Sequence, residues 1–324
     1  MEQPYIALLR SFPGDPAAML REAGFTNVWE NPEPRKLSDD EIAEHAHSAT
    51  GVMIAPGDGQ FGGAFFDAVG EQLRVISCYA VGYDSVNVAE ATARGIAVGY
   101  TPGPTTEPTA DIAWLLLLGA ARNAAWCNQL LHSGSWRGIS PTDRLGVGVE
   151  GKTLLIVGAG RIGTAVAQRA QGWRMEILYY SRSRNRELEE GGVNARRVAL
   201  DDGLKQADFV SIHCPLTVDT KHLFDKPRFA GMKTGAILIN TSRGAVVDEA
   251  ALADALGNGH LGGAGLDVFE NEPAIHPELL KSDKVFMLPH IGSATREARL
   301  WMTEMSVANL VAGVRGEPLP NLAS

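Results

Sequence analysis

The sequence has few cysteines and no long apolar run. Its longest apolar stretch, Ile112–Ala121, is about half the length of a membrane span. Glu2 and Arg10 near the start are unlike a secretory signal. We therefore expect a cytoplasmic protein without a membrane segment. Three cysteines are too widely spaced for a disulfide framework or a zinc site, and we expect them to be buried structural residues: Cys78, Cys127 and Cys214.

The sequence also lacks an excess of positive charge. It has 29 Lys and Arg against 38 Asp and Glu, a formal net charge of −9 at pH 7. A protein that binds nucleic acid or an anionic membrane needs a basic surface, so we expect neither partner. If this protein binds a small anion, its cations must be concentrated locally. A length of 324 residues predicts about two domains.

Short apolar runs alternate with helical patterns through the first hundred residues. This alternation predicts a parallel sheet with helices on its faces. Ser38 opens one of the helices with a capping box that ends at Glu41. The runs that predict buried strands are Tyr5–Leu9, Gly51–Ala55, Leu73–Cys78 and Ile96–Val98.

A proline-rich segment, Tyr100–Pro108, then interrupts the pattern and predicts a linker. A long apolar helix is expected over Thr109–Leu131, and an amphipathic helix over Thr295–Val314 is long enough to return to the first domain. A second alternating block lies between these helices. Its predicted strands are Thr153–Val157, Ile177–Tyr180, Phe209–His213, Ala236–Asn240, Gly263–Val268 and Val285–Leu288. The fold class is therefore α/β, with two doubly wound parallel-sheet domains.

A glycine-rich turn follows the first strand of this block and opens the helix Arg161–Arg169. In a dinucleotide-binding turn, the first glycine makes the bend and the second lets the backbone approach the pyrophosphate. The third lets the helix pack on the strand. The start of the helix supplies free N–H donors for the phosphates. The predicted cofactor-binding residues of this turn are Gly158, Gly160, Arg161, Ile162 and Gly163.

The end of the next strand lacks the carboxylate with which an NAD site holds the ribose. The segment Ser181–Arg186 contains three arginines and no acid. A carboxylate would repel a 2′-phosphate, whereas arginine binds it through two hydrogen bonds. We therefore predict a preference for NADPH, with NADH possible; the alternative is a solvated basic loop. The predicted contacts are Ser181, Arg182, Ser183 and Arg184.

Reduction of a 2-oxo acid by hydride needs a cation, a proton donor and a group that holds the donor. His213 and His290 follow predicted strands, as do Arg243 and the two acids Glu270 and Glu272. Position alone does not choose between the histidines or between the acids. Four other histidines fall in helix ends or loops and are expected to be solvated: His132, His222, His260 and His276.

Several ordered segments resemble the D-isomer-specific 2-hydroxyacid dehydrogenase family, over nearly the whole chain and most weakly before residue 70. They are Ser77–Gly82, Thr101–Gly103, Gly158–Gly163, His213–Thr217, Ile239–Gly244, Val247–Leu252, Gly265–Pro273 and Pro289–Ser293. The resemblance implies a Rossmann-type cofactor domain, residues 102–291, inserted into a flavodoxin-like substrate domain, residues 1–101 and 292–324. It also implies a homodimer that forms through the helix around 109–131.

The resemblance assigns the catalytic roles to Arg243, Glu272 and His290. His290 would donate the proton, and Glu272 would hydrogen-bond its imidazole and favour the charged ring. Arg243 would bind the carboxylate and the carbonyl oxygen of the substrate. The backbone at Val81 and Gly82, with Ser293, would complete substrate binding. Further cofactor contacts implied are Thr109, Pro215, Thr220, Thr241, Asp267 and Gly292.

Within the family, the arginine-bearing strand end resembles glyoxylate/hydroxypyruvate reductases. Ala55–Phe61 and Ser77–Tyr83 contain no cation for a substrate phosphate, so we expect a small 2-oxo acid, glyoxylate or hydroxypyruvate, to be reduced to the D-2-hydroxy acid. Tyr79 is a bulky residue beside the expected substrate contacts, so the sequence does not predict the size of the substrate pocket. The alternatives are a D-lactate, phosphoglycerate or phosphite-type dehydrogenase, or a non-catalytic co-repressor-like module. The sequence stops soon after its last helix, from which we expect no long regulatory extension.

Overall fold

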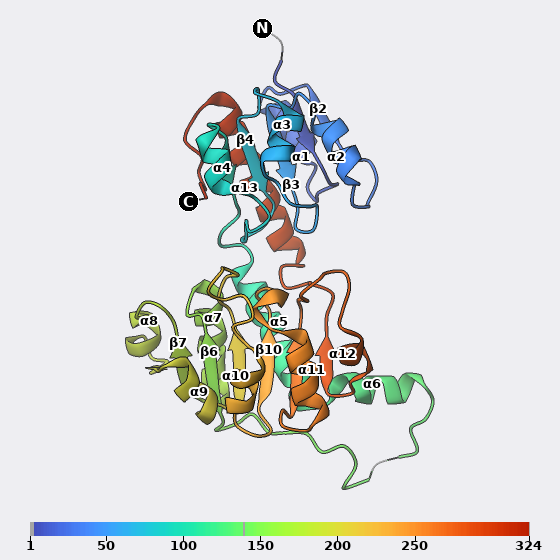
Figure 1. Cartoon of the computed structure of the whole chain (residues 1–324), viewed down its shortest axis with the longest axis vertical. Helices are drawn as coiled ribbons and strands as arrows, with labels where there is room; N and C mark the ends of the chain where they lie inside the picture. The colour runs from blue at the N-terminus through green and yellow to red at the C-terminus, as the bar shows by residue number, and fades with distance from the viewer. Residues whose placement is uncertain (1–2, 139, 324) are drawn as a thin grey trace. The chain divides into compact units, whose positions relative to one another are not determined.

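The computed structural model describes residues 3–138 and 140–323 and divides the chain into two compact units (Figure 1). Unit 1 comprises Met1–Thr105 and Ser293–Ser324, and unit 2 comprises Thr106–Gly292. The chain leaves the first unit once and returns to it once. The corresponding predicted boundaries were after residues 101 and 291.

Unit 1 contains a parallel sheet with the strand order β2-β1-β3-β4-β5. The four predicted strands are present; the first three are slightly shorter than expected, and the fourth is shifted by one residue. The strand β2 was not predicted, because it is a three-residue edge strand with half-buried side chains and no continuous apolar run. The strands are β1 (Ile6–Leu8), β2 (Val28–Glu30), β3 (Gly51–Ile54), β4 (Val75–Cys78) and β5 (Ala97–Gly99).

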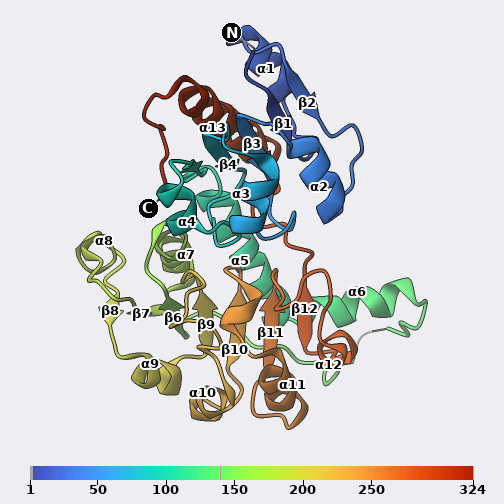
Figure 2. The same ribbon diagram turned by 45° about the horizontal axis from the view of Figure 1, so that its top comes forward.

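Helices cover both faces of this sheet, as Figure 2 shows. One face packs against α2, α3 and α4 through residues such as Ile42 and Phe66. The other packs against α1 and α13 through Leu20 and Leu310. Unit 1 is therefore doubly wound, as predicted. The helices are α1 (Pro16–Glu22), α2 (Asp39–Ala46), α3 (Gly63–Val69), α4 (Val88–Ala93) and α13 (Arg296–Arg315).

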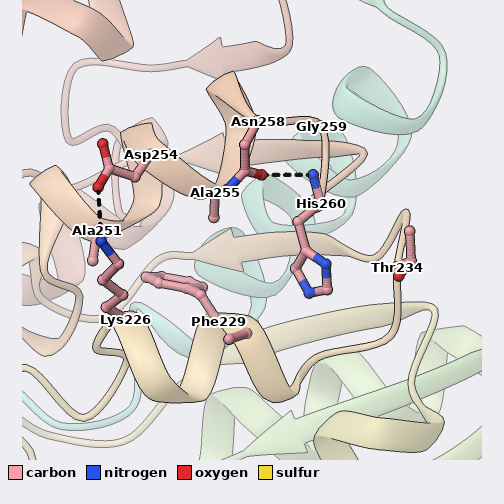
Figure 3. Close-up of a pocket in the computed structure, with 10 residues that line it drawn as sticks. Lys226, Phe229, Thr234, Ala251, Asp254, Ala255, Asn258, Gly259 and His260 are labelled. Carbon is pink, nitrogen blue, oxygen red and sulfur yellow. Dashed lines mark hydrogen bonds and ion pairs between the residues drawn. The ribbon is translucent and has the colours of Figure 1, made fainter.

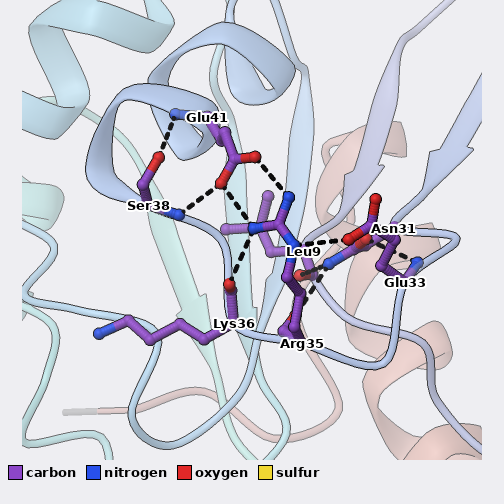
Figure 4. Close-up of polar contacts among 7 residues, drawn as sticks. All are labelled: Leu9, Asn31, Glu33, Arg35, Lys36, Ser38 and Glu41. Carbon is purple, nitrogen blue, oxygen red and sulfur yellow. Dashed lines mark hydrogen bonds and ion pairs between the residues drawn. The ribbon is translucent and has the colours of Figure 1, made fainter.

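The capping box predicted at Ser38 is present at the start of α2 (Figure 4). The Ser38 hydroxyl accepts the Glu41 N–H at 3.2 Å, and the Glu41 carboxylate accepts the Ser38 N–H at 2.7 Å. Arg35 binds both carboxylate oxygens of Glu41, at 2.8 and 2.6 Å. This guanidinium lowers the pKa of Glu41 to about 2.

The helix α13 returns the chain to unit 1 and packs closely on β4. A Cβ at Gly313 would lie 2.4 Å from the Cβ of Val75, so the close contact depends on a residue without a side chain. The Ser77 hydroxyl donates to the Ser306 carbonyl at 3.0 Å. The buried Asn309 donates to Tyr100 O at 3.1 Å. These bonds fix the last helix against segments from the first hundred residues.

Unit 2 contains a parallel sheet with the strand order β12-β11-β10-β9-β6-β7-β8. The direction of winding reverses between β6 and β9, which is where open α/β sheets bind ligands. The exposed two-residue strand β8 was not predicted. The strands are β6 (Thr153–Val157), β7 (Glu176–Tyr180), β8 (Arg196–Arg197), β9 (Phe209–Ile212), β10 (Ile237–Asn240), β11 (Gly263–Leu266) and β12 (Val285–Met287).

The helices of unit 2 also cover both faces of their sheet. The first group packs on one face through Leu116, Val166 and Leu188. It consists of α5 (Thr106–Ala121), α7 (Arg161–Ala170) and α8 (Arg186–Glu190). The second group packs on the other face through residues such as Phe229 and Leu252. It consists of α9 (Leu200–Gln206), α10 (Lys226–Gly231), α11 (Glu249–Gly257) and α12 (Pro277–Lys281).

The single helix predicted over Thr109–Leu131 is two helices, α5 and α6 (Ala124–His132). The chain breaks at Asn123, which lies in the left-handed region at φ 53°. Asparagine tolerates this conformation better than most residues, and apolar periodicity does not reveal it. The residues of α6 are not buried within the chain. Cys127 on α6 is exposed, so its predicted burial was wrong, whereas Cys78 is buried as predicted.

No helix in residues 3–138 and 140–323 has the length and apolar composition to cross a membrane.

Candidate active site

The three glycines of the turn after β6 have different surroundings. Gly158 lies at φ 99°, and a Cβ there would be 2.5 Å from the Cys214 nitrogen. A Cβ at Gly163 would be 2.2 Å from the Gly158 carbonyl oxygen, whereas one at Gly160 would meet no atom within 4 Å. The first and third glycines therefore permit close backbone packing, and the second leaves open space beside the backbone.

This open space lies at the start of α7. Gly160 is the residue before the helix, and no side chain caps it. The N–H groups of the first helical turn, from Arg161 to Gly163, have no partner within the helix and attract anions. The Asn185 amide closes the turn from the side, donating to Ala159 O at 3.0 Å and to Thr164 Oγ1 at 2.9 Å. The residues present therefore fit the pyrophosphate of a dinucleotide.

The predicted basic loop follows β7, and its two candidate arginines differ. Arg184 forms ion pairs with Glu189 and Glu190, which α8 brings back toward the loop. Across the described part of the chain, the Arg182 guanidinium forms no hydrogen bond or ion pair. The structure thus leaves the charge of Arg182 available and largely neutralises that of Arg184.

A third arginine, which the sequence did not indicate, reaches the same loop. The Nη2 of Arg197 donates to the carbonyl oxygens of Ser181 and Arg182, at 2.9 and 2.8 Å. Arg197 lies on β8, which pairs with β7 and so brings this residue beside the loop. Sequence reasoning missed it because an exposed Arg-Arg pair carries no strand signal. Its position adds a second guanidinium at this loop, bonded to the backbone of Arg182.

The predicted triad lies along one edge of the sheet. Arg243 follows β10, Glu272 follows β11 and His290 follows β12, and these three strands are neighbours. The Nδ1 of His290 lies 2.8 Å from Glu272 Oε2, and Glu272 Oε1 accepts the Phe269 N–H at 3.0 Å. A carboxylate only accepts hydrogen bonds, so Nδ1 carries the proton of this bond and Nε2 stays available.

The charges around Glu272 keep it ionised. Burial raises the pKa of this carboxyl, but the hydrogen bond and charge of His290, the Phe269 N–H and the charge of Arg243 outweigh it and lower the pKa overall. The side chains of His290 and Glu272 are 38% and 36% exposed, so a small molecule can reach them. His290 also lies in the left-handed region at φ 52°, which costs about 1–2 kcal/mol for a residue with a Cβ.

The other histidine at a strand end, His213, is half-buried and lies between two hydroxyls. Its ring nitrogens lie 2.8 Å from Ser211 Oγ and 3.3 Å from Thr241 Oγ1. Burial lowers the pKa of His213 to about 3, so the ring is neutral at physiological pH. His222 has a side chain that is 38% exposed, consistent with the predicted solvation, and its Nε2 also lies 2.6 Å from Glu270 Oε1. The two acids that position alone could not separate therefore bind different histidines.

The buried Asp267 holds the chain just after His290. Its two oxygens accept the N–H groups of Ile291 and Gly292, both at 2.8 Å. Burial raises the pKa of Asp267, and these two hydrogen bonds oppose the effect. A Cβ at Gly292 would lie 3.1 Å from Asp267 Oδ2 and 3.3 Å from Thr109 Oγ1. Three of the predicted cofactor residues thus form one buried cluster.

The loop after β9 is closed by its own hydroxyls. Thr220 Oγ1 donates to Pro215 O at 2.6 Å and lies 2.7 Å from the Thr217 nitrogen, from which it accepts. Cys214 at the start of this loop is half-buried, and burial raises the pKa of its thiol to about 11. The thiol is therefore protonated at physiological pH, in keeping with the structural role expected for it.

The predicted substrate contacts Val81, Gly82 and Ser293 belong to unit 1. Val81 and Gly82 follow β4, and the Val81 side chain is exposed. Tyr79 is buried, with its hydroxyl donating to Arg299 O at 2.6 Å and its ring packed on Phe12. Its bulk thus fills the core of unit 1.

A hollow of about 500 Å³ lies elsewhere in unit 2, between α10 and α11 (Figure 3). Its lining includes Thr234 and His260, which come just before β10 and β11. The His260 ring contacts Met232 O at 3.1 Å. The hollow is therefore at the amino ends of these strands, opposite the edge with Arg243 and Glu272. Among the residues with described positions, no group of three or more His, Cys, Asp or Glu could hold a metal ion.

Comparisons with known proteins agree with this architecture. A family model for the NAD binding domain of D-isomer specific 2-hydroxyacid dehydrogenases matches residues 114–292. The chain is 43% identical to a glyoxylate reductase of Thermococcus litoralis, over 99% of this chain and 97% of that protein. It is 42% identical to a glyoxylate reductase of Pyrococcus horikoshii, over 99% and 96%.

A similar solved structure is an NADPH-dependent glyoxylate/hydroxypyruvate reductase of Sinorhizobium meliloti in complex with NADP and malonate. It is 30% identical, with a TM-score of 0.83 over 100% of this chain and 97% of that one. Fold and site together define a dehydrogenase that uses a nicotinamide dinucleotide. The chain belongs to the D-isomer specific 2-hydroxyacid dehydrogenase family.

The surroundings of the glycines predict opposite effects for two substitutions. Gly163→Ala places a methyl group against the Gly158 carbonyl, so we expect it to lower the free energy of unfolding by about 1–3 kcal/mol. Gly160→Ala meets no protein atom, so we expect near-native stability but about tenfold or greater loss of dinucleotide affinity. Urea unfolding and calorimetric titration measure the two effects. Native affinity in Gly160→Ala would contradict this assignment.

Proposed function

We propose that the protein reduces glyoxylate or hydroxypyruvate to the D-2-hydroxy acid with NADPH. The observation that carries this proposal is the His290–Glu272 pair. It lies at the same sheet edge as Arg243, which follows β10, and in the same unit as the glycine turn. The names of the similar proteins support the substrate class. Ala55–Phe61 and Ser77–Tyr83 contain no Lys or Arg, which favours an unphosphorylated substrate.

Each residue of the triad has a distinct proposed task. The residues of the glycine turn would hold the dinucleotide, whose nicotinamide would supply the hydride that the carbonyl carbon receives. His290 donates the Nε2 proton to the carbonyl oxygen, because its Nδ1 proton is engaged by Glu272. Glu272 is ionised and accepts the Nδ1 hydrogen bond, which orients the imidazole for the transfer. Arg243 binds the substrate carboxylate and draws electron density toward the carbonyl oxygen, and Val81, Gly82 and Ser293 remain proposed substrate contacts.

The proposed NADPH preference rests on the loop after β7. A 2′-phosphate needs cations, and Arg182 and Arg197 supply two at this loop, with Arg197 hydrogen-bonded to the loop backbone. Ser181 takes the place where NAD enzymes have a carboxylate. The remaining proposed cofactor contacts are Thr109, Gly158, Gly160, Arg161, Ile162, Gly163, Ser183, Arg184, Pro215, Thr220, Thr241, Asp267 and Gly292.

Removal of the proton donor tests the mechanism. We expect His290→Ala to lower kcat for glyoxylate by about 10²–10⁴-fold, because a positioned general acid contributes this much. Steady-state rates at saturating NADPH measure the effect. His47→Ala, at an exposed position in unit 1, is the control and should keep wild-type rates; equal rates in the two variants would refute the assignment.

The two loop arginines offer a matched test of cofactor choice. Arg182→Ala should raise KM for NADPH about tenfold or more and leave KM for NADH nearly unchanged, because only NADPH has the phosphate. Arg184→Ala should have a smaller effect, because Glu189 and Glu190 already pair with this charge. Rates with both cofactors over a panel of 2-oxo acids provide the measurement. A wild type that uses NADH as well as NADPH would contradict the proposed preference, and faster turnover of pyruvate would favour a D-lactate enzyme.

We further propose a homodimer that forms through the region 109–131. No residue of α6 is buried within the chain, and apolar side chains in and around this region are exposed: Leu115, Leu131, Trp136 and Leu145. A second copy would cover them. Leu131→Arg should shift the protein from dimer to monomer in light scattering at micromolar concentration, whereas Leu280→Arg, at an exposed position on α12, should not. A monomeric wild type would rule the proposal out.

A further inference from the structure

The buried carboxylate of Glu249 binds the backbone on both sides of Glu272, the residue that pairs with His290. Glu249 is the first residue of α11 and is only 6% exposed. Its Oε1 accepts the Glu270 N–H at 2.7 Å, and its Oε2 accepts the His276 N–H at 3.1 Å. A buried carboxylate is tolerated only with such partners, so both oxygens are committed to these two backbone groups.

The two N–H groups lie at the two ends of the segment 270–276, and Glu272 lies between them. One side chain therefore fixes the backbone before and after the residue that binds His290. Glu272 has its own second bond, from the Phe269 N–H, so its position also follows the position of this segment. A shift of the segment would move Glu272 Oε2 relative to His290 Nδ1.

The same segment contacts the turn that carries Arg243. A Cβ at Gly244 would lie 1.8 Å from the Phe269 carbonyl carbon, so the two backbones are in direct contact. The Glu270 side chain binds His222, and the His222 N–H donates to Ala245 O at 2.8 Å. The backbone that carries Arg243 and the backbone that carries Glu272 are thus joined on two sides.

We propose that Glu249 is a positioning residue that holds Glu272 in register with His290 through the backbone of 270–276. This role rests on the proposed function, in which His290 donates the proton. Glu249 acts without touching the substrate, and a displacement of about 1 Å at the reacting groups can cost about 10²-fold in rate. None of the sequence patterns indicated this role, because the Glu249 partners are backbone groups more than twenty residues away.

Glu249→Gln tests the proposal in the full-length protein. The amide keeps one acceptor oxygen, but its NH₂ group faces a backbone N–H, so one of the two bonds is lost. We expect kcat for glyoxylate to fall about 10- to 100-fold, with KM for NADPH nearly unchanged. If Glu249→Gln does not fold, Glu249→Asp, whose shorter side chain reaches one N–H, should show a smaller fall in kcat, again with KM for NADPH nearly unchanged.

The matched control is the neighbouring Asp248→Ala. Asp248 accepts the Ala251 N–H at 3.0 Å and caps α11, so its loss costs stability in the same helix, about 0.5–2 kcal/mol, without releasing the segment 270–276. Its kcat and its KM for NADPH should match the wild type. The proposal is overturned if the Glu249 variant keeps the wild-type kcat, or if Asp248→Ala lowers kcat as much with an unchanged KM for NADPH.

His290→Ala separates this inference from the proposed function. If His290→Ala keeps wild-type turnover, the proton-donor assignment itself fails. If His290→Ala loses turnover while Glu249→Gln retains it, only the positioning role fails.

Discussion

In a parallel sheet every strand ends at the same edge, and the candidate site of this protein depends on that constraint. β6 ends in the glycine turn and β7 in the basic loop, while β10, β11 and β12 lead to Arg243, Glu272 and His290. Residues more than a hundred positions apart are thereby gathered along one side of unit 2. The hollow between α10 and α11 lies at the opposite edge and contains none of them.

Close contacts between backbones fix the geometry of the loops that carry these site residues. At Gly158, Gly163 and Gly244 a Cβ would lie within 2.5 Å of backbone atoms from another turn or from the same one. Such contacts leave the loops little freedom to move separately, since interiors at this density cannot absorb an added methyl group. The hydrogen bonds of Glu249 then fix the segment that carries Glu272. Those of Asp267 fix the two residues that follow His290.

The positions of a few arginines matter more for anion binding in this protein than its net charge does. The chain has a net charge of −9, yet Arg182, Arg197 and Arg243 lie at the strand ends where a dinucleotide and a 2-oxo acid are proposed to bind. Arg184 belongs to the same segment, but Glu189 and Glu190 pair with its charge. Two arginines of one short loop therefore have different electrostatic roles, which depend on where α8 brings its carboxylates.

The sequence by itself determined the alternation of strands and helices, the glycine turn, the Ser38 capping box and the absence of an acid at Ser181. These features are local, since each depends on residues within a few positions of one another. Only the tertiary structure showed the break at Asn123, the pairing of His222 with Glu270, the approach of Arg197 to the basic loop and the two bonds of Glu249. Position in the sequence did not distinguish Glu272 from Glu270, and only the resemblance to the family selected Glu272. The physical reason is that these contacts join distant segments, and their geometry follows from strand register and close packing rather than from any local pattern.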